Sequence, residues 1–322
     1  MRALPDIAVV VPSHDRPPRL RWLLNALEEQ TLPHDRWEVI VGHDSAGPQT
    51  ERLLREHPLA RRGVLRHVTL PPGSAPPGAN RNAAWRLARA PLIAFTDDDC
   101  RPPPDWLARV LAAAQDNPGA IVQGATFKDP DEINQESAAQ YHSQTVRPPT
   151  PWAEACNIVY PREVLERLGG FNEEKYTGED CELALRARAD GVPYVPARDA
   201  VTYHAVVEIT LPERLRGIWR WQDLPWVVRE HPELREAFPL WIFWKREHVW
   251  FPFAVAGAVL ERRNVLWGLL AVPWLIHATP RRGNDPRGRL RGLAELPGRA
   301  AVVVAEYATL LRGSAKYRSL LL

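Results

Sequence analysis

Along the first two hundred residues, short apolar runs alternate with segments in which apolar residues recur every three or four positions. Four runs are rich in β-branched residues and bounded by Pro, Gly, Asp or Ser, which predicts buried parallel strands. They are residues 7–11, 37–41, 65–69 and 92–96. Amphipathic helices are predicted beside them, at residues 19–29, 49–56 and 79–88. This alternation predicts an α/β sheet, in which ligands bind beyond the carboxyl ends of the strands.

The alternation of predicted strands and helices changes twice along the chain. From about residue 120 to residue 204, a polar stretch (residues 128–150) precedes a short strand near Asn157 and two helices. We expect this region to be the acceptor-binding half of the same domain. The composition changes again after Leu211, where a helical, aromatic-rich extension is predicted. The expected domains are therefore residues 1–210, divided into halves at 1–100 and 101–210, and residues 211–322.

The extension carries eight of the thirteen tryptophans, between Trp219 and Trp274. Its apolar segments at residues 249–260 and 265–276 are short of the roughly 20 residues that a spanning helix needs. With the basic run at residues 280–292, they are typical of an interfacial helical hairpin on an anionic membrane surface. We expect peripheral membrane contact through residues 241–292. The alternative is that these helices pack on the rest of the chain or on a second subunit in a homodimer.

Composition narrows the possible classes of protein. The chain has 322 residues, of which 45% are hydrophobic and 25% charged, which is typical of globular proteins and excludes a disordered chain. Three widely spaced cysteines with no CxxC pair predict neither a disulfide framework nor a zinc ribbon, so a reducing cytoplasm is expected. The first apolar run is too short for a signal peptide. The expected location is cytoplasmic, at the inner face of the cell membrane. The basic C-terminal tail, residues 281–322, lacks any recognisable nucleic-acid-binding module, so no nucleic-acid partner is expected.

The strongest chemical signal is TDDDC, residues 96–100, directly after a predicted strand. Three adjacent carboxylates repel one another unless a cation or protons compensate. Oxygen ligands suit Mg²⁺ or Mn²⁺, which keep positions open for water and substrate phosphates. The alternative is a solvated turn in which Asp105 caps the next helix.

Two further signals lie in the second half of the domain. In TGEDCELALRARADG, residues 177–191, Glu179 and Asp180 fall in the first turn of a predicted helix, whose dipole holds a carboxylate ionised. Such a residue could accept a proton from a sugar or lipid hydroxyl, although a capping arrangement from Thr177 to Asp180 is equally consistent. His204 is either a metal ligand or a structural histidine.

The loops after the first two predicted strands supply polar groups at the same sheet edge. Pro12, Ser13 and Asp15 follow the first strand and could contact a base or ribose, and Asp44 follows the second. Arg81, in PPGANRNAA, could meet a diphosphate. Neither GxGxxG nor GxxxxGK[ST] is present, so a Rossmann dinucleotide site and a P-loop are not predicted.

Taken together, these motifs resemble family 2 glycosyltransferases over about two thirds of the chain. The matching residues, in order, are Pro12–Arg16, Asp44, Arg81-Asn82, Asp97-Asp98-Asp99, Gly169-Gly170-Phe171-Asn172, Glu179-Asp180 and His204. The resemblance implies a GT-A fold, a nucleotide-sugar-binding α/β sheet fused to an acceptor-binding half. It also implies inverting transfer of a sugar to an acceptor hydroxyl, usually with manganese or magnesium. The acceptor expected here is a lipid-linked or cell-envelope glycan.

The resemblance also implies roles for individual residues. Asp97 and Asp99 match the DxD motif, with Asp99 a direct metal ligand, Asp97 at the ribose or the metal, and Asp98 among the nucleotide-sugar contacts. His204 matches a histidine that completes the metal site. Asp180 matches the catalytic base, and Glu179 beside it is a positioning or acceptor-binding group. Asp44 matches the aspartate that contacts the uracil edge, and Arg81 matches the residue that contacts the diphosphate.

The chain departs from the family pattern at three places. His14-Asp15 stands where an aromatic residue and Asn are common, and His43-Asp44-Ser45 where a double Asp and Gly are usual. Both changes lie in the loops that are expected to contact the nucleotide base. The favoured donor is a UDP-sugar. The QxxRW motif of processive members is missing, so a single transfer per encounter is expected. The rival functions are a non-catalytic nucleotide-sugar-binding module and a sugar nucleotidyltransferase.

Overall fold

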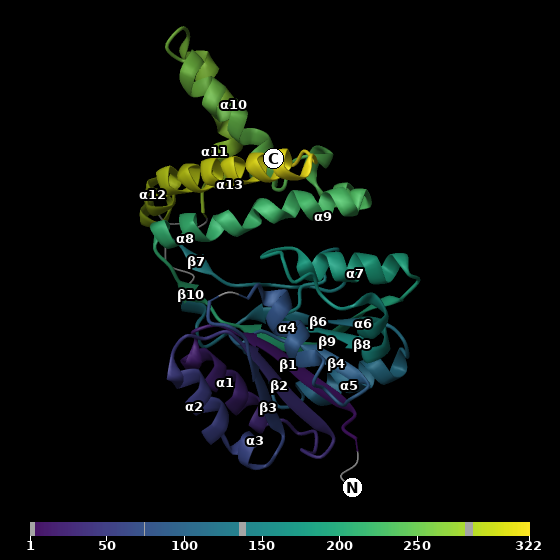
Figure 1. The fold of residues 1–322 in the computed structure, drawn as a ribbon. Coiled ribbons are helices and arrows are strands. Elements are labelled where there is room, and N and C mark those ends of the chain that lie inside the picture. Colours follow the sequence, from purple (N-terminus) through teal and green to yellow (C-terminus); the bar gives the residue numbers. More distant parts are fainter. Residues whose placement is uncertain (1–3, 74, 135–139, 281–285) are drawn as a thin grey trace. The chain divides into compact units, whose positions relative to one another are not determined.

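The computed structural model describes residues 4–73, 75–134, 140–280 and 286–322, and the chain divides into two compact units (Figure 1). Unit 1 comprises residues 1–134 and 142–207. Unit 2 comprises residues 135–141 and 208–322. Part of the basic run at residues 280–292, namely residues 281–285, lies outside the described residues.

Unit 1 is built on an eight-stranded sheet in the order β3-β2-β1-β4-β8-β6-β9-β5. Its strands are β1 (Ile7–Ser13), β2 (Trp37–His43), β3 (Leu65–Thr69), β4 (Leu92–Phe95), β5 (Cys100–Arg101), β6 (Ile121–Lys128), β8 (Ile158–Pro161) and β9 (Tyr194–His204). The four strands from β1 to β4 pair in parallel, as the apolar runs predict, and β6 is parallel to β9. β8 is antiparallel to β4 and β6, and β5 to β9. The prediction of a mostly parallel α/β sheet is therefore confirmed.

Helices cover both faces of this sheet (Figure 1). They are α1 (Pro17–Glu28), α2 (Pro48–Glu56), α3 (Pro58–Arg61), α4 (Pro77–Trp85), α5 (Trp106–Asp116), α6 (Arg162–Leu168) and α7 (Glu179–Ala189). Side chains alternate between the faces of a strand. Accordingly, Ile7, Val9 and Val11 of β1 pack with α1, α2, α3 and α5, whereas Ala8 and Val10 pack with α4, α6 and α7. This two-sided burial explains why the strands appear in the sequence as continuous apolar runs.

Unit 2 is helical. Its elements are α8 (Leu211–Ile218), η2 (Trp219–Asp223), α9 (Leu224–Glu230), η3 (Pro232–Ala237), η4 (Pro239–Trp241), α10 (Arg246–Leu260), η5 (Val265–Ala271), α11 (Val272–Ala278), α12 (Pro286–Ala294) and α13 (Leu296–Tyr317). Two short strands, β7 (Tyr141–His142) and β10 (Val207–Glu208), pair where the chain passes between the units.

The longest helix, α13, packs against α8, η2 and α9. A Cβ at Gly313 of α13 would lie 2.2 Å from the Gln222 carbonyl oxygen, so the absence of a side chain lets the two backbones meet. A buried hydrogen bond of 2.6 Å, from the Tyr317 hydroxyl to Asp223 Oδ1, ties the same helix to η2. The helices α8, η2, α9 and α13 therefore form a well-packed part of unit 2.

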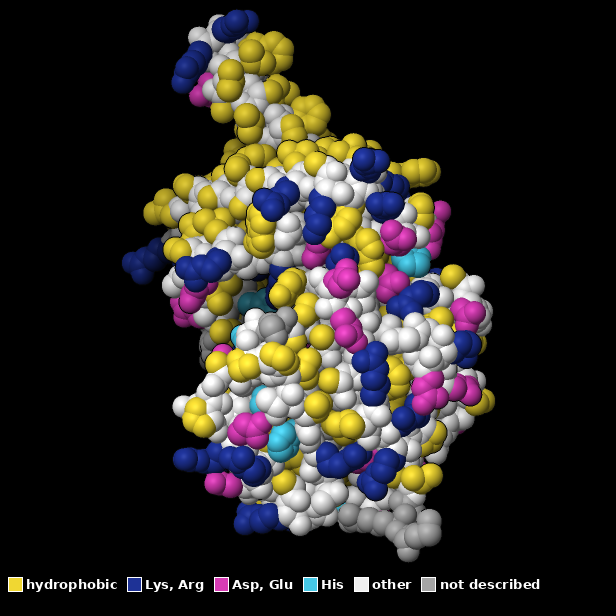
Figure 2. Space-filling model, in the orientation of Figure 1, with side chains coloured by type: hydrophobic (Ala, Val, Ile, Leu, Met, Phe, Trp, Pro, Cys, Tyr) yellow, Lys and Arg dark blue, Asp and Glu magenta, His cyan; other side chains and the backbone are white. Residues whose placement is uncertain are grey.

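The segment from α10 to α11 leaves many apolar side chains in solvent. Ala254, Trp274 and Ala278 form a small buried cluster between these helices. Around them, exposed apolar residues are Phe253, Val255, Val259, Val265, Leu266, Trp267, Leu269, Val272 and Ile276. Figure 2 shows these yellow side chains over the segment labelled α10 in Figure 1, with basic side chains at its tip. Within the described residues, every helix is too short or too polar to cross a bilayer.

Candidate active site

The loops that follow β1, β2 and β4 converge at one edge of the sheet. β1 lies between β2 and β4, so their carboxyl ends are neighbours. The Ser13 hydroxyl donates to Asp98 Oδ2 at 2.7 Å, across 85 residues of sequence. His14 Nδ1 lies 3.0 Å from Asp44 Oδ1. Residues that the sequence analysis selected from three separate loops therefore lie together.

The three aspartates of the TDDDC motif have different surroundings. Asp98 is fully buried and lies 2.6 Å from Arg16 Nη2; burial raises its pKa to about 7, outweighing the opposing effect of Arg16. For Asp99, burial also acts to raise the pKa, but the charges of His204 and Arg16 outweigh it and the net pKa is lowered. Asp97 is partly exposed, and its Oδ1 accepts a hydrogen bond of 2.9 Å from Arg81. The protein thus supplies cationic partners to all three carboxylates.

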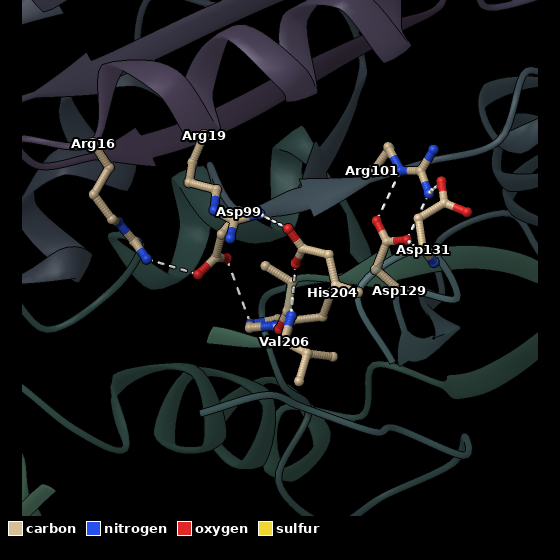
Figure 3. Close-up of polar contacts among 10 residues, drawn as sticks. Arg16, Arg19, Asp99, Arg101, Asp129, Asp131, His204 and Val206 are labelled. Carbon is tan, nitrogen blue, oxygen red and sulfur yellow. Dashed lines mark hydrogen bonds and ion pairs between the residues drawn. The ribbon is translucent and has the colours of Figure 1, made fainter. Parts of the chain in front are cut away.

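Arg16 is the main cationic partner of these carboxylates, and no role was predicted for it. Its guanidinium bridges Asp98 and Asp99, with Nη1 2.7 Å from Asp99 Oδ2 (Figure 3). Asp15, with φ of 47°, turns the chain just before Arg16. The signal available in the sequence was an arginine in the loop that directly follows the first strand.

His204 and Asp99 form the arrangement that best fits a metal ion. His204 ends β9, and its Nε2 is 3.4 Å from Asp99 Oδ1, an oxygen with no hydrogen-bond partner (Figure 3). His204 Nδ1 lies 2.9 Å from the Ala205 carbonyl oxygen, which can only accept, so Nδ1 carries the proton. When the ring is neutral, Nε2 points a lone pair at the Asp99 carboxylate. Two electron donors facing each other fit a cation between them.

Arg81 joins the aspartate motif to the helix that carries Glu179 and Asp180. Its buried guanidinium donates to Glu179 Oε1 at 2.7 Å as well as to Asp97 and lies over the Phe171 ring, 5.6 Å from its centroid. Both of these hydrogen bonds therefore go to carboxylates, where a diphosphate contact was predicted. The diphosphate contact stays a prediction, in which the diphosphate would approach Arg81 beside the partly exposed Asp97.

Asp180 lies in the first turn of α7, whose N-cap is Gly178 with φ of 85°. Its Oδ2 accepts from the Ala155 N–H at 3.2 Å, and its Oδ1 from the Cys181 N–H at 2.8 Å. Burial first, and then the charge of Glu179, raise its pKa to about 7. A carboxylate with this pKa can exchange a proton at neutral pH.

The residues predicted at the nucleotide base are tied into loops. Asp44 Oδ1 accepts from Asn80 Nδ2 at 3.1 Å besides contacting His14, and its Oδ2 accepts from the Ala75 N–H at 3.2 Å. Asp15 Oδ1 accepts from the Ala46 N–H at 2.9 Å, which connects the first two loops. Asp15 remains largely exposed. These contacts fix the positions of the loops around Asp44.

Two further positioning residues had no predicted role. Asn82 is fully buried and bonds both the N–H and the carbonyl oxygen of Phe171, which attaches α4 to the Gly169–Asn172 loop. Glu132 accepts from Arg19 at 2.5 Å and from the Val206 N–H at 2.9 Å, which holds the segment after His204 in place. Asn82 lies in the Arg81-Asn82 motif, but no local pattern shows what these residues contact, because their partners lie 74 to 113 positions away.

Comparison with known proteins adds to this geometry. Residues 8–170 match the family model described as "Glycosyl transferase family 2". Validoxylamine A glucosyltransferase of Streptomyces hygroscopicus subsp. limoneus is 26% identical over 266 residues, covering 72% of this chain and 58% of that protein. Glycosyltransferase AglE of Haloferax volcanii is 24% identical over 208 residues, covering 62% of this chain and 67% of that protein. The chain thus spans 58% of the length of the first of these relatives.

Solved structures share the fold. Mannosyltransferase PcManGT from Pyrobaculum calidifontis, in complex with GDP-Man and Mn²⁺, superposes with a TM-score of 0.59 at 22% identity, covering 98% of this chain and 88% of that one. TarS of S. aureus (residues 1–349), in complex with UDP, gives a TM-score of 0.53 at 15% identity, covering 98% and 92%. The predicted GT-A fold is therefore confirmed, and it is the fold class of these glycosyltransferases. Within that class, the chain belongs to glycosyl transferase family 2.

Proposed function

We propose that the protein is an inverting glycosyltransferase, which moves a sugar from a nucleotide-sugar to an acceptor hydroxyl in a single transfer. The observation that carries the proposal is the position of Arg81, which contacts both Asp97 of the DxD motif and Glu179, the residue before Asp180. A group for the donor and a group for the acceptor are thereby held by one buried side chain. A binding module that had lost its chemistry would have no need of this arrangement.

The proposed metal ligands are Asp99 and His204, with Asp97 at the ribose or the metal, and the proposed ion is Mn²⁺ or Mg²⁺. When bound, such an ion stabilises the negative charge that develops on a departing diphosphate. Arg16 contacts Asp99 of the proposed metal site as well as Asp98 and is half exposed, so its guanidinium can also meet a phosphate.

The proposed base is Asp180. Its pKa of about 7 allows the carboxylate to take the proton of the acceptor hydroxyl as the new glycosidic bond forms. A retaining mechanism would need a second carboxylate as nucleophile. Glu179 is the nearest candidate, but it is engaged with Arg81 at 2.7 Å. One free base supports inversion.

The proposed donor is a UDP-sugar, with the base near Asp44. A carboxylate selects the N–H edge of a base, and both uracil and guanine present one. Among the structures of similar fold, one holds GDP-Man and one holds UDP. GDP-sugars are therefore the first alternative to test.

For the acceptor we propose a lipid-linked or cell-envelope glycan, reached from the cytoplasmic face of the membrane. The exposed apolar side chains from α10 to α11 support this, together with exposed Arg262 and Arg263 between those helices. Relatives include an "O-antigen biosynthesis protein RfbC" of Myxococcus xanthus, which is 29% identical over 222 residues, covering 61% of this chain and 17% of that protein. A homodimer that buries the same side chains is the competing arrangement.

The first experiment measures thermal stability with UDP, GDP, dTDP or CDP, each with and without Mn²⁺. A ligand at 100 times its dissociation constant adds about 2.7 kcal/mol to the free energy of unfolding. We expect a manganese-dependent rise with UDP that is lost in Asp99→Asn. Failure of every nucleotide to stabilise the protein would contradict the proposal. Formation of the nucleotide-sugar itself from a sugar phosphate would instead identify a nucleotidyltransferase.

A further inference from the structure

Two histidines and a glutamate from three elements of unit 1 gather beside the proposed base pocket. His43 ends β2, His67 lies on β3 and Glu51 lies on α2. His43 Nε2 is 3.2 Å from Glu51 Oε1, and His67 Nε2 is 3.2 Å from Glu51 Oε2. The ligand atoms of the three residues all lie within 4.8 Å of one another. Each carboxylate oxygen of Glu51 therefore faces a different imidazole nitrogen.

These separations suit a shared metal ion better than direct ion pairs. Hydrogen bonds between charged nitrogen and carboxylate groups are about 2.7–2.9 Å long. Two ligand atoms that each lie about 2.0–2.1 Å from a tetrahedral Zn²⁺ are about 3.3 Å apart. The two contacts of 3.2 Å are close to that second value.

The pKa values of Glu51 and His43 are both shifted toward the form that binds a metal. The Thr69 hydroxyl donates to Glu51 Oε1 at 2.6 Å, and this hydrogen bond is the main reason why the pKa of Glu51 is lowered. Burial is the main reason why the pKa of His43 is lowered. These shifts favour the ionised carboxylate and the neutral imidazole, the forms in which the two groups bind a metal.

A second cluster in unit 2 shows how a similar set is satisfied without a metal. Glu306 is buried and accepts from His248 Nε2 at 2.9 Å, but its other oxygen lies 2.6 Å from Lys245 Nζ. The lysine supplies the compensating charge there. In the unit 1 cluster the arginine paired with Glu51 is Arg55, at 3.8 Å and 65% exposed.

We propose that His43, Glu51 and His67 form a second metal site, which binds a divalent transition metal such as Zn²⁺ and is distinct from the Asp99–His204 pair. Two imidazoles and one carboxylate suit zinc, whereas Mg²⁺ prefers oxygen ligands alone. An ion there ties α2 to the end of β2, next to Asp44, and to the middle of β3. The site stands independently of the proposed transferase activity.

The test is a titration of the metal-stripped full chain with Zn²⁺ in competition with a chromophoric chelator. It is carried out in the Asp99→Asn background, so that the other candidate site does not contribute. We expect one equivalent of Zn²⁺, with the dissociation constant raised about a hundredfold in His67→Ala and in Glu51→Gln. The matched control, His34→Ala, changes a partly buried histidine of the same unit and should bind as the parent does.

Absence of zinc binding in the parent would overturn the proposal, as would unchanged affinity in both variants. The visible absorption of bound Co²⁺ gives a second readout, because a four-coordinate site with nitrogen ligands absorbs far more strongly than an octahedral site of oxygens. A weak, octahedral spectrum from the Asp99→Asn protein, in which the cluster is intact, would also contradict the site. This measurement needs no substitution at the cluster, so it remains decisive if a variant fails to fold.

Discussion

The two units of the chain bury their apolar residues to very different extents. Every residue from Ile7 to Val11 of β1 is 0% exposed, because β1 has a strand on each edge and helices on each face. In α10 only His248, Ala254 and Gly257 are buried among 15 residues, and the following segment leaves Val265 80% exposed. Apolar residues therefore complete a core around β1 and form a surface on the segment from α10 to α11. This difference is why we assign the chemistry to unit 1 and contact with an apolar partner to unit 2.

The largest effect is expected where a charge is buried in unit 1. Arg81→Met removes the partner of two carboxylates, and breaking a buried ion pair costs about 3–5 kcal/mol. The control is Arg86→Met, whose exposed ion pair with Glu173 is worth about 0–1 kcal/mol. Urea unfolding followed by circular dichroism measures both. Equal midpoints for the two variants would show that Arg81 is not held as described.

The next effect concerns catalysis alone. Asp180→Asn is expected to cut turnover by about a hundredfold or more, because the amide cannot accept the hydroxyl proton. Nucleotide affinity should be unchanged. Asp190→Asn, at the exposed C-terminal end of the same helix, is the control and should retain activity. Full turnover in Asp180→Asn would remove this residue from the mechanism.

The pH profile tests the same residue without a substitution. The folded pKa of Asp180 is raised from 3.8 to about 7, so turnover should increase as pH rises through about 7 and the base loses its proton. The effect on stability has the opposite sign. The unfolded chain releases this proton at lower pH than the folded one, so the Asp180 contribution to the free energy of unfolding falls between those two values. A turnover that does not change between about pH 6 and pH 8 would contradict the assignment.

The smallest effect on stability is expected at the exposed surface of unit 2. Val265→Ser with Leu266→Ser should change the free energy of unfolding by about 0.5 kcal/mol or less per site, since both side chains are already in solvent. Sedimentation with anionic vesicles should nevertheless decrease. Leu87→Ser, an exposed leucine of unit 1, is the control. If the double variant binds vesicles as the parent does, or if the parent fails to bind, the membrane proposal is wrong.

The sequence predicted the first four strands because their apolar runs are buried on both faces, which leaves a pattern that needs no knowledge of tertiary structure. It placed the start of the first helix at residue 19, whereas α1 begins at Pro17. The difference arises because Pro is compatible with the first helical turn, where its missing N–H is not needed. The antiparallel position of β8 beside β4 could not be predicted, since nothing local to residues 158–161 records its partner.

The candidate site was predicted in the same uneven way. Asp97, Asp99, Asp180 and His204 lie in motifs, so their spacing identified them. Arg16 and Asn82 act through partners 83 and 89 positions away, and such contacts emerge only when the sheet is assembled. The charge compensation of the TDDDC motif could likewise not be assigned from sequence, which pointed to a metal where the protein also provides Arg16.

The pairing of Asp99 with His204 has a consequence for the way the protein is made. β9, which ends at His204, lies between β6 and β5 in the sheet, so β5 has no neighbouring strand until β9 is in place. During translation, the ribosome must add a further 105 residues after Asp99 before His204 exists. The nascent chain therefore carries Asp99 without His204 until almost all of unit 1 has been synthesised. A nucleotide-sugar that needs both residues cannot be captured until the last strand of this unit has joined the sheet.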